Sequence, residues 1–347
     1  MEIIRLTQFS PGSGCGCKIA PKVLEEILQG QTSELVSPNL LVGHDEKDDA
    51  AVYDLGNGTA LVSTTDFFTP IVDDPYDYGR IAATNALSDV YAMGGKPLLA
   101  IAILGWPVDK LPAQIAGIVV QGARAVCTQN GIPLAGGHSI DIQDPVFGLA
   151  VTGIVEIKYL KRNSTATPGC RIYLTKPLGI GMISTAEKKG LARAEHLLKA
   201  KDLMLRSNAA GSLLATLPYI TAMTDVTGFG LAGHLLEMCE GSGIDATIDF
   251  DRVPVIDGIE EYIKLNTIPG GTYRNFKSYG EKISPLDHYQ KMILCDPQTS
   301  GGLLLAVEEK HTVEFETFCQ EHEISFFGIG QTLPSAGNIV RLALSKA

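Results

Sequence analysis

The chain has 347 residues, of which 45% are hydrophobic and 19% charged, and its formal net charge is -11. This length and composition allow two domains with full hydrophobic cores and carry no signature of disorder. The acidic excess argues against a nucleic-acid-binding surface, because phosphate backbones are bound by clustered Lys and Arg. We therefore expect any nucleotide to bind to this chain through metal ions.

The sequence also limits where the protein works. The first residues contain no apolar segment typical of a signal peptide, and the most apolar run, residues 97–106, is too short to span a bilayer. The seven cysteines are an odd number and lie scattered along the chain, which does not suit a disulfide framework. We therefore expect a cytoplasmic protein with reduced thiols and no membrane contact.

Strands and helices alternate in the first half of the chain. The spacing of apolar residues predicts helices at residues 21–28, 76–93 and 113–130. Runs rich in β-forming residues predict strands at residues 50–55, 60–65, 98–104, 132–135 and 146–157. Gly56-Asn57-Gly58 joins the first two of these runs and predicts a hairpin, because such turn positions tolerate positive φ.

Residues 158–169 are polar, rich in Ser and Thr, and end in Pro-Gly, so we place a linker there. A second alternating half follows. Strands are predicted at residues 171–175, 244–250 and 303–307, and helices at 203–217, 231–239 and 312–321. The expected organisation is a flexible glycine-rich segment, an N-terminal domain, the linker and a C-terminal α/β domain, at residues 1–20, 21–157, 158–169 and 170–347.

The segment Gly12-Ser13-Gly14-Cys15-Gly16-Cys17-Lys18 combines a flexible backbone with two thiols and an ammonium group. It is a poor phosphate-binding P-loop, because Cys17 replaces the second glycine and Ile19 replaces the hydroxyl that would hold magnesium. Zinc is also disfavoured, since Cys-x-Cys offers only two ligands. Burial of the thiols as small hydrophobic side chains is the structural alternative. Because Lys18 and a predicted helix start lie near Cys15, we expect a lowered pKa for that thiol.

Several aspartates form the second feature. They stand at or near the ends of predicted elements, at Asp48, Asp49, Asp66, Asp89 and Asp225. Each alone could be a solvated surface residue. Asp89, however, lies in an apolar stretch and shares a helix face with Asn85, where a carboxylate needs a partner. Oxygen ligands without His or Cys favour Mg²⁺, which is usually held by few carboxylates plus substrate phosphates. The aspartates therefore predict a magnesium-nucleotide site.

Residues 228–233, Gly-Phe-Gly-Leu-Ala-Gly, fit the dinucleotide-binding fingerprint, with Asp249 at a suitable distance beyond them. Asp225 lies just before these glycines, where its charge would repel a pyrophosphate. A sharp turn that points Asp225 at a site is the better interpretation. His138, beside two glycines, is either a base or ligand, or a hydrogen-bonded loop histidine.

Five segments together carry a resemblance that covers essentially the whole chain. They are GSGCGCKIAPKVLEEIL at residues 12–28, the run at 48–97 that ends in SDVYAMGGKP, LAGGHSI at 134–140, AMTDVTGFGLAGHL at 222–235 and CDPQTSGGLLLAV at 295–307. In this order they resemble the selenophosphate synthetase family. The resemblance implies an α/β (α+β) two-domain fold like that of aminoimidazole ribonucleotide synthetase. It also implies a homodimer in which the N-terminal sheets pair into a β-barrel, with ATP held near the interface.

The same resemblance implies the activity and its parts. The family converts selenide, ATP and water into selenophosphate, orthophosphate and AMP, with Mg²⁺ as cofactor. Cys15 matches the catalytic cysteine and Lys18 the lysine that contacts ATP. The metal-binding positions are matched by Asp49, Asp89 and Asp225. The other nucleotide-contacting positions are matched by Glu46, Lys47, Asp48, Asp66, Asp89, Gly137, His138 and Ser139. A selenium-delivery protein is a further expected partner.

One departure and three alternatives stay open at this point. Pro11 stands where some bacterial members of the family carry a histidine. Another ATP-dependent enzyme of this fold, such as an aminoimidazole ribonucleotide synthetase or a thiamine phosphate kinase, would share the aspartates but has no reason to carry Cys15 and Lys18. A thiol-based metal or redox protein would leave the aspartates unexplained. An NAD-binding oxidoreductase would rest on residues 228–233 alone.

Overall fold

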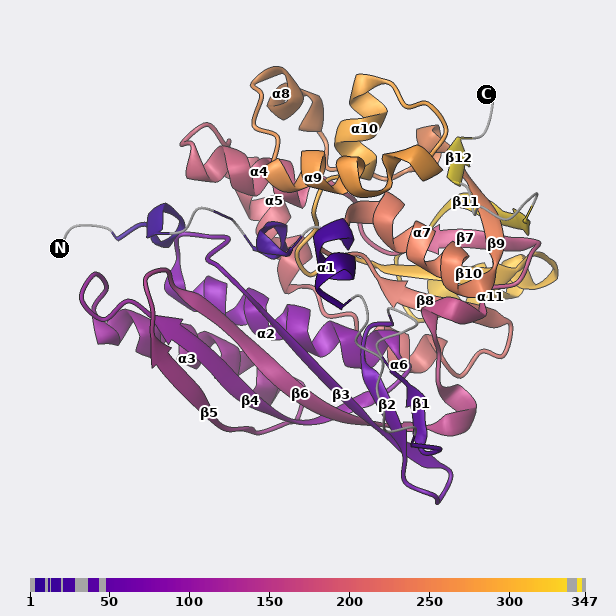
Figure 1. Ribbon diagram of the computed structural model, residues 1–347, viewed down its shortest axis with the longest axis horizontal. Coiled ribbons are helices and arrows are strands. Elements are labelled where there is room, and N and C mark those ends of the chain that lie inside the picture. The colour runs from indigo at the N-terminus through magenta and orange to yellow at the C-terminus, as the bar shows by residue number, and fades with distance from the viewer. Residues whose placement is uncertain are drawn as a thin grey trace.

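The structure is a computed structural model that describes residues 4–9, 12, 14–19, 21–28, 37–43, 48–335 and 342–344. Within these ranges the chain builds two six-stranded sheets with helices packed around them (Figure 1). No helix in these ranges is long and apolar enough to cross a membrane. The α/β two-domain class predicted from the sequence is confirmed.

The first sheet holds all of the strands that the structure describes before residue 157. They are β1 (Leu40–Val42), β2 (Ala51–Asp54), β3 (Thr59–Phe68), β4 (Lys96–Trp106), β5 (Leu134–Asp141) and β6 (Val146–Glu156). Their order across the sheet is β1-β2-β3-β6-β4-β5, and every neighbouring pair is antiparallel except β4 and β5. β2 and β3 form the predicted hairpin, in which Gly56 and Gly58 have positive φ.

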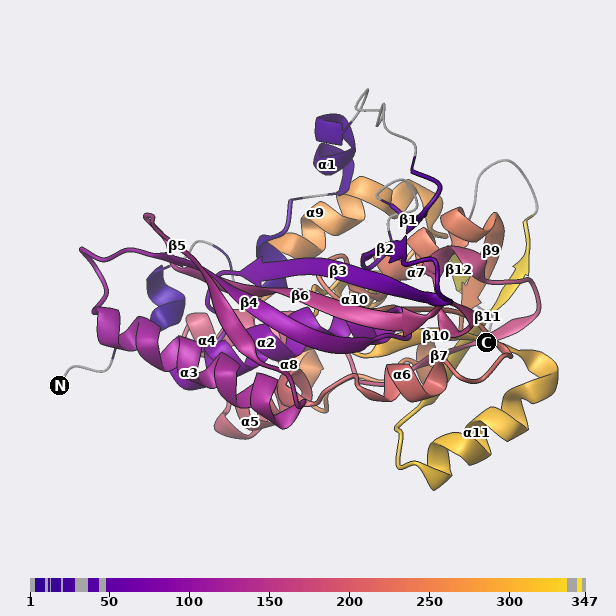
Figure 2. The same ribbon diagram turned by 90° about the horizontal axis from the view of Figure 1, so that it is seen from below.

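Two long helices lie along this sheet (Figures 1 and 2). They are α2 (Pro75–Ala92) and α3 (Ala113–Gln129). α2 begins at Asp74, whose side chain accepts a hydrogen bond from the Asp77 backbone N–H at 2.8 Å, a typical N-cap. Most of α2 is buried, including Asn85, Ser88 and Asp89, because the helix packs on the first sheet and also against elements of the second half. α2 thus carries polar side chains into the middle of the molecule.

The second half contains the second sheet and most of the helices. The strands are β7 (Cys170–Leu174), β8 (Ile220–Asp225), β9 (Ile244–Ile248), β10 (Leu303–Glu308), β11 (Phe327–Pro334) and β12 (Leu342–Leu344), in the order β12-β9-β11-β7-β10-β8. The helices are α4 (Ile180–Lys188), α5 (Ala194–Leu205), α6 (Ala210–Leu214), α7 (Gly230–Ser242), α8 (Ile259–Lys264), α9 (Gly270–Tyr279), α10 (His288–Leu294) and α11 (Thr312–Glu321). The predicted helix at residues 21–28 is confirmed as α1 (Pro21–Leu28).

The second sheet excludes a dinucleotide-binding unit at residues 228–233. In such a unit the strands before and after the helix are neighbours that pair in parallel. Here α7 is flanked by β8 and β9, which are not neighbours, because three strands lie between them in the sheet. Within the described residues β8 pairs with β10 alone, and that pairing is antiparallel. Residues 228–233 therefore serve another purpose.

Two predicted elements differ most in extent from the observed ones. The helix predicted at residues 203–217 is divided into α5 and α6, because Asn208 between them turns its side chain inward and donates to Ser88 and to the Gly301 carbonyl. The strand predicted at 132–135 continues to Asp141 as β5, so His138 lies in a strand and not in a loop. Gly136 makes this possible, since its φ of 126° allows an irregularity in the pairing with β4.

The two sheets lie on either side of residues 158–169, where the linker is predicted. One continuous cluster of buried side chains nevertheless runs through both halves, from Leu6 to Ile329. The domain boundaries therefore stay a prediction.

Candidate active site

The glycine-rich segment is docked between the two halves of the molecule. The Gly14 backbone N–H donates to the Thr69 carbonyl, just after β3, at 3.1 Å. The Cys15 N–H donates to the Thr299 hydroxyl, just before β10, at 2.9 Å. Residues Cys15–Cys17 form one turn of 3-10 helix between these anchors. The turn fixes where the side chains of Cys15 and Lys18 point.

Cys15 is completely buried, whereas Cys17 is exposed. The Cys15 thiol donates to Asn85 Oδ1 at 3.4 Å. Desolvation by burial raises the pKa of Cys15 well above its usual range, the charge of Asp66 raises it further, and Lys18 offsets only part of this. The expected lowering of this pKa was therefore wrong for this conformation. The sequence could not reveal that the thiol would be removed from water.

Lys18 lies beside the first aspartate of the site. Its ammonium nitrogen is 3.7 Å from Asp66 Oδ2, and its side chain stays partly exposed. Desolvation lowers the pKa of Lys18, but the charges of Asp66 and of the neighbouring acidic groups outweigh this and raise it above its ordinary value. Lys18 is therefore a permanent positive charge at this place.

Asn85 connects these groups and was not singled out as a site residue from the sequence. Its amide nitrogen donates to Asp66, while its Oδ1 accepts from the Cys15 thiol and from the Ser300 N–H, the latter at 2.7 Å. The only signal in the sequence was its spacing of four residues from Asp89 on one helix face. Asn85 thus ties the thiol, the aspartate and the turn before β10 to one helix.

The three predicted metal ligands lie close to one another inside the molecule. Asp49 accepts from the Thr224 hydroxyl at 2.8 Å, Asp89 from the Thr64 hydroxyl at 2.5 Å, and Asp225 from Ser88. Desolvation raises the pKa of all three carboxyls. The charge of Asp225 adds to the rise for Asp49 and Asp89. Buried carboxyls that repel one another in this way are neutralised either by protons or by a bound cation.

The donor atoms of this cluster fit Mg²⁺. Asp49 Oδ2 is buried and has no hydrogen-bond partner among the described residues. No three His, Cys, Asp or Glu side chains in the described ranges converge closely enough to hold a metal ion alone. The unpartnered oxygen of Asp49 suits Mg²⁺, which binds oxygen, takes few carboxylates and completes its shell with water and substrate phosphates.

The remaining predicted nucleotide contacts are distributed differently. Asp48 is beside the cluster, where its Oδ1 accepts from the Asn163 N–H at 3.0 Å. Gly137 shares a row of the first sheet with Asp66, but two strands lie between them, a separation of about 14 Å at the usual strand spacing. His138 and Ser139 are exposed on the same edge strand. Glu46 and Lys47, like Pro11 and Ser13, lie outside the described residues.

The glycine-rich segment is docked against Gly228, in the motif at residues 228–233, and against the turn at Thr299 and Ser300, in the motif at residues 295–307. A Cβ on Gly228 would lie 2.8 Å from the Cys15 carbonyl oxygen and 2.9 Å from Lys18 Cδ, so only glycine allows this approach. Ser300 takes a positive φ of 50°, and its turn presents Thr299 to the Cys15 backbone. Sequence reasoning missed these contacts because they join residues more than 200 positions apart.

The fold and the site place this chain in a class of proteins with known relatives. The family model described as AIR synthase related protein, N-terminal domain, matches residues 47–155, and the corresponding C-terminal domain matches residues 167–343. Among solved structures, a complex titled AaThiL with AMPPCP and TMP is 17% identical with a TM-score of 0.67, covering 94% of this chain and 93% of that one. Hydrogenase maturation protein HypE in complex with ATP is 20% identical with a TM-score of 0.62, covering 86% and 83%. The chain is therefore an AIR synthase related protein.

Comparison with curated sequences identifies a family within this class. The chain is 58% identical over 334 residues to the selenide, water dikinases of Escherichia coli O139:H28 and Shigella flexneri, covering 96% of each chain in both cases. It belongs to the selenide, water dikinase family, as the resemblance predicted.

Proposed function

We propose that this protein synthesises selenophosphate from selenide, ATP and water, releasing orthophosphate and AMP. Membership of the selenide, water dikinase family supports the reaction. The observation that carries its assignment to particular residues is the docked segment: it holds the thiol of Cys15 and the ammonium of Lys18 at Asp66, beside the aspartate cluster. A single closure of this segment brings both groups to one place.

The aspartates and Lys18 would receive the triphosphate of ATP. Asp49, Asp89 and Asp225 are the residues that would hold Mg²⁺, with Asp48 beside them. The bound metal would neutralise phosphate charge and stabilise the charge that develops during phosphoryl transfer. Lys18 supplies a fixed positive charge from the protein itself, and such preorganised charge is effective where water is excluded. Asp66 and Asn85 keep Lys18 and Cys15 in position.

Cys15 would meet selenide in a site closed to solvent. Its thiol is buried, and its backbone is held by Thr299. Because hydroselenide is a soft, oxidisable nucleophile, a water-excluding segment that carries a thiol can retain it while ATP is cleaved. Gly228 permits the close seat of the segment that excludes water.

We also propose that two copies pair through the first sheet to form a β-barrel. The face of this sheet turned away from α2 carries exposed apolar side chains on β3, β4 and β5, namely Phe67, Leu99, Ile101 and Ile140. Such a row of apolar side chains is typical of an interface. A second copy on this face would also enclose the exposed edge strand of Gly137, His138 and Ser139, where we place contacts with ATP. Sedimentation velocity measures the oligomeric state of the protein. The variant Ile101→Lys should be a monomer, because it places a charge in the apolar face. A dimer that persists in this variant would contradict the proposal.

We place the protein in the cytoplasm, with a selenium-delivery protein as an upstream partner. All seven cysteines are free, and free thiols persist in a reducing compartment. Selenide is also readily oxidised, so a protein donor would protect it on the way to the site.

The decisive experiment is anaerobic phosphorus NMR with Mg-ATP and selenide. We expect a phosphorus resonance coupled to selenium, together with orthophosphate and AMP. Accumulation of ADP with no selenium-coupled resonance would contradict the proposed reaction. A reaction without selenide serves as the control for ATP hydrolysis alone.

A further inference from the structure

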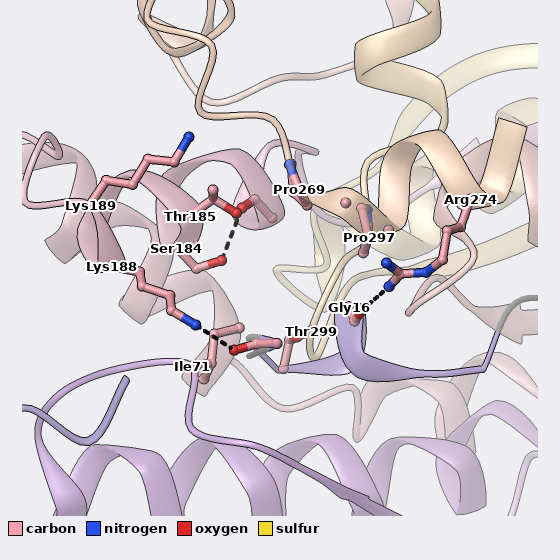
Figure 3. Close-up of a pocket in the computed structure, with 14 residues that line it drawn as sticks. Gly16, Ile71, Ser184, Thr185, Lys188, Lys189, Pro269, Arg274, Pro297 and Thr299 are labelled. Carbon is pink, nitrogen blue, oxygen red and sulfur yellow. Dashed lines mark hydrogen bonds between the residues drawn. The ribbon is translucent and has the colours of Figure 1, made fainter. Parts of the chain in front are cut away.

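A second pocket lies beside the docked segment and is not used by the proposed mechanism. Its volume is about 480 Å³. Figure 3 shows Lys188 and Lys189 on one side of it, Arg274 on the other, and Gly16 and Thr299 at its base. The walls come from the end of α4, the start of α9 and the glycine-rich segment. None of the described residues that line it is Asp or Glu.

The charge of this pocket is unusual in a chain with a net charge of -11. Lys189 donates to the Asn266 carbonyl at 2.9 Å and Arg274 to the Gly16 carbonyl at 2.8 Å. Neither cation forms a salt bridge within the described part of the chain. Lys188 donates to the Gly12 carbonyl at 3.3 Å and adds a third positive charge. For Lys189 and Arg274, carbonyl contacts alone leave the positive charge uncompensated within the described residues, so the pocket attracts anions.

The donors of the pocket favour an oxyanion over a soft anion. They are a guanidinium group, two ammonium groups and the hydroxyls of Thr185 and Thr299. Guanidinium in particular matches the geometry of a phosphate group. The α9 helix begins at the pocket with Gly270 and Gly271, whose N–H groups belong to the first turn. The pocket lies on the Gly16 and Thr299 side of the segment, whereas Lys18 faces Asp66.

We propose that this pocket binds a phosphoryl anion released by the reaction, orthophosphate or selenophosphate. The inference rests on the proposed function for the source of the anion, but the binding itself does not. The segment separates the two sites, so the pocket offers the product a seat with positive charge outside the crowded aspartate cluster. Lys188, Lys189 and Arg274 are the residues that hold the anion there.

The test measures binding of inorganic phosphate to the full chain by isothermal titration calorimetry, without ATP, Mg²⁺ or selenide. The double variant Lys189→Gln/Arg274→Gln removes two exposed charges. We expect it to weaken phosphate binding about tenfold or more, since each lost charge-assisted hydrogen bond is a strong one. Lys277→Gln removes one charge from the far end of the same helix, α9, and is the matched control, with binding expected to be unchanged.

Lys18→Ala separates this pocket from the triphosphate site. Phosphate binding that survives Lys18→Ala but weakens in the double variant supports the proposal. Binding that is lost in Lys18→Ala and unchanged in the double variant would overturn it, and so would the absence of phosphate binding to the unmodified protein. The titration measures binding and no turnover, so the two experiments test separate proposals. A negative phosphate titration does not affect the selenophosphate assay, and a negative selenophosphate assay does not affect the titration.

A second titration identifies which product the pocket prefers. Thiophosphate, the sulfur analogue of selenophosphate, replaces inorganic phosphate. Tighter thiophosphate binding that depends on Lys189 and Arg274 supports selenophosphate as the ligand, and tighter phosphate binding supports orthophosphate. Binding of either anion that ignores the double variant contradicts the site.

Discussion

The glycine-rich segment has two sets of neighbours of opposite charge. Cys15 and Lys18 face Asp66 and Asn85, next to buried carboxyls whose pKa values are raised by desolvation and by one another. The carbonyls of Gly12 and Gly16 instead accept from Lys188 and Arg274. The acidic side favours cations and the basic side favours anions. The glycine-rich segment thus lies between the proposed metal-nucleotide site and the pocket proposed to bind phosphate.

The largest effect is expected from the thiol on the acidic side. Cys15→Ser should abolish selenide-dependent turnover while leaving magnesium-dependent ATP binding nearly intact, because a serine hydroxyl can still donate to Asn85. Cys17→Ser is the matched control, since Cys17 is exposed and two positions away. Anaerobic phosphorus NMR and equilibrium dialysis with ATP measure the two properties. Loss of ATP binding in Cys15→Ser would make the cysteine a structural residue.

The next largest effect on activity is expected from the positive charge of Lys18, on the acidic side of the segment. Lys18→Ala should lower selenophosphate formation about 100-fold or more, since preorganised charge at a phosphoryl-transfer site has effects of this size. Circular dichroism should show an unchanged fold, because Lys18 is partly exposed. Lys22→Ala, an exposed lysine four positions later in α1, is the control. Normal selenophosphate output from Lys18→Ala would remove its assigned role.

The sequence predicted local features of the molecule but not the contacts between distant segments. The β2-β3 hairpin followed from Gly56 and Gly58, because turn chemistry is local. The aspartates were found because a carboxyl in an apolar stretch, such as Asp89, needs a partner. The seat formed by Gly228 and Thr299 could not be predicted, since it depends on the packing of segments distant in sequence. The raised pKa of Cys15 was missed for the same reason: burial is a property of the fold.

The basic pocket was also invisible in the sequence. Lys188 and Lys189 close α4, where cations are common because they complement the helix dipole. Arg274 lies in α9, more than eighty positions later. No local sequence pattern indicates that these residues line one pocket, because only the fold brings the end of α4 and the start of α9 together.

A moderate effect is expected at the metal ligands. Asp225→Asn should raise the Mg²⁺ concentration that gives half-maximal activity by about tenfold or more, because even indirect support of a metal ligand is worth this much. Asp225 accepts from Ser88, and an asparagine oxygen can still do so, which preserves the packing. Asp257→Asn, at an exposed aspartate, controls for the loss of one charge. An unchanged magnesium titration would reassign Asp225.

The last prediction concerns stability rather than activity, at an acidic group next to the basic pocket. Asp296 is completely buried and accepts from the Gly181 N–H at 3.0 Å and from Gln298 at 2.8 Å. Burial raises the pKa of Asp296 from its usual range to about 8, against the lowering effect of these hydrogen bonds. Asp296 therefore keeps its proton at neutral pH and does not cancel the charge of the pocket.

The sign of the resulting pH dependence follows from linkage. Between pH 4 and pH 8 the unfolded chain has released the Asp296 proton while the folded chain retains it. The group's contribution to stability therefore falls as pH rises, by at most ~1.4 kcal/mol per pH unit. Asp296→Asn keeps a neutral side chain and should remove this slope from the free energy of unfolding, measured in urea from pH 5 to pH 8. Asp257→Asn should leave the slope unchanged. Parallel curves for the unmodified protein and Asp296→Asn would mean that Asp296 is ionised, and the pocket's positive charge would then be partly cancelled from below.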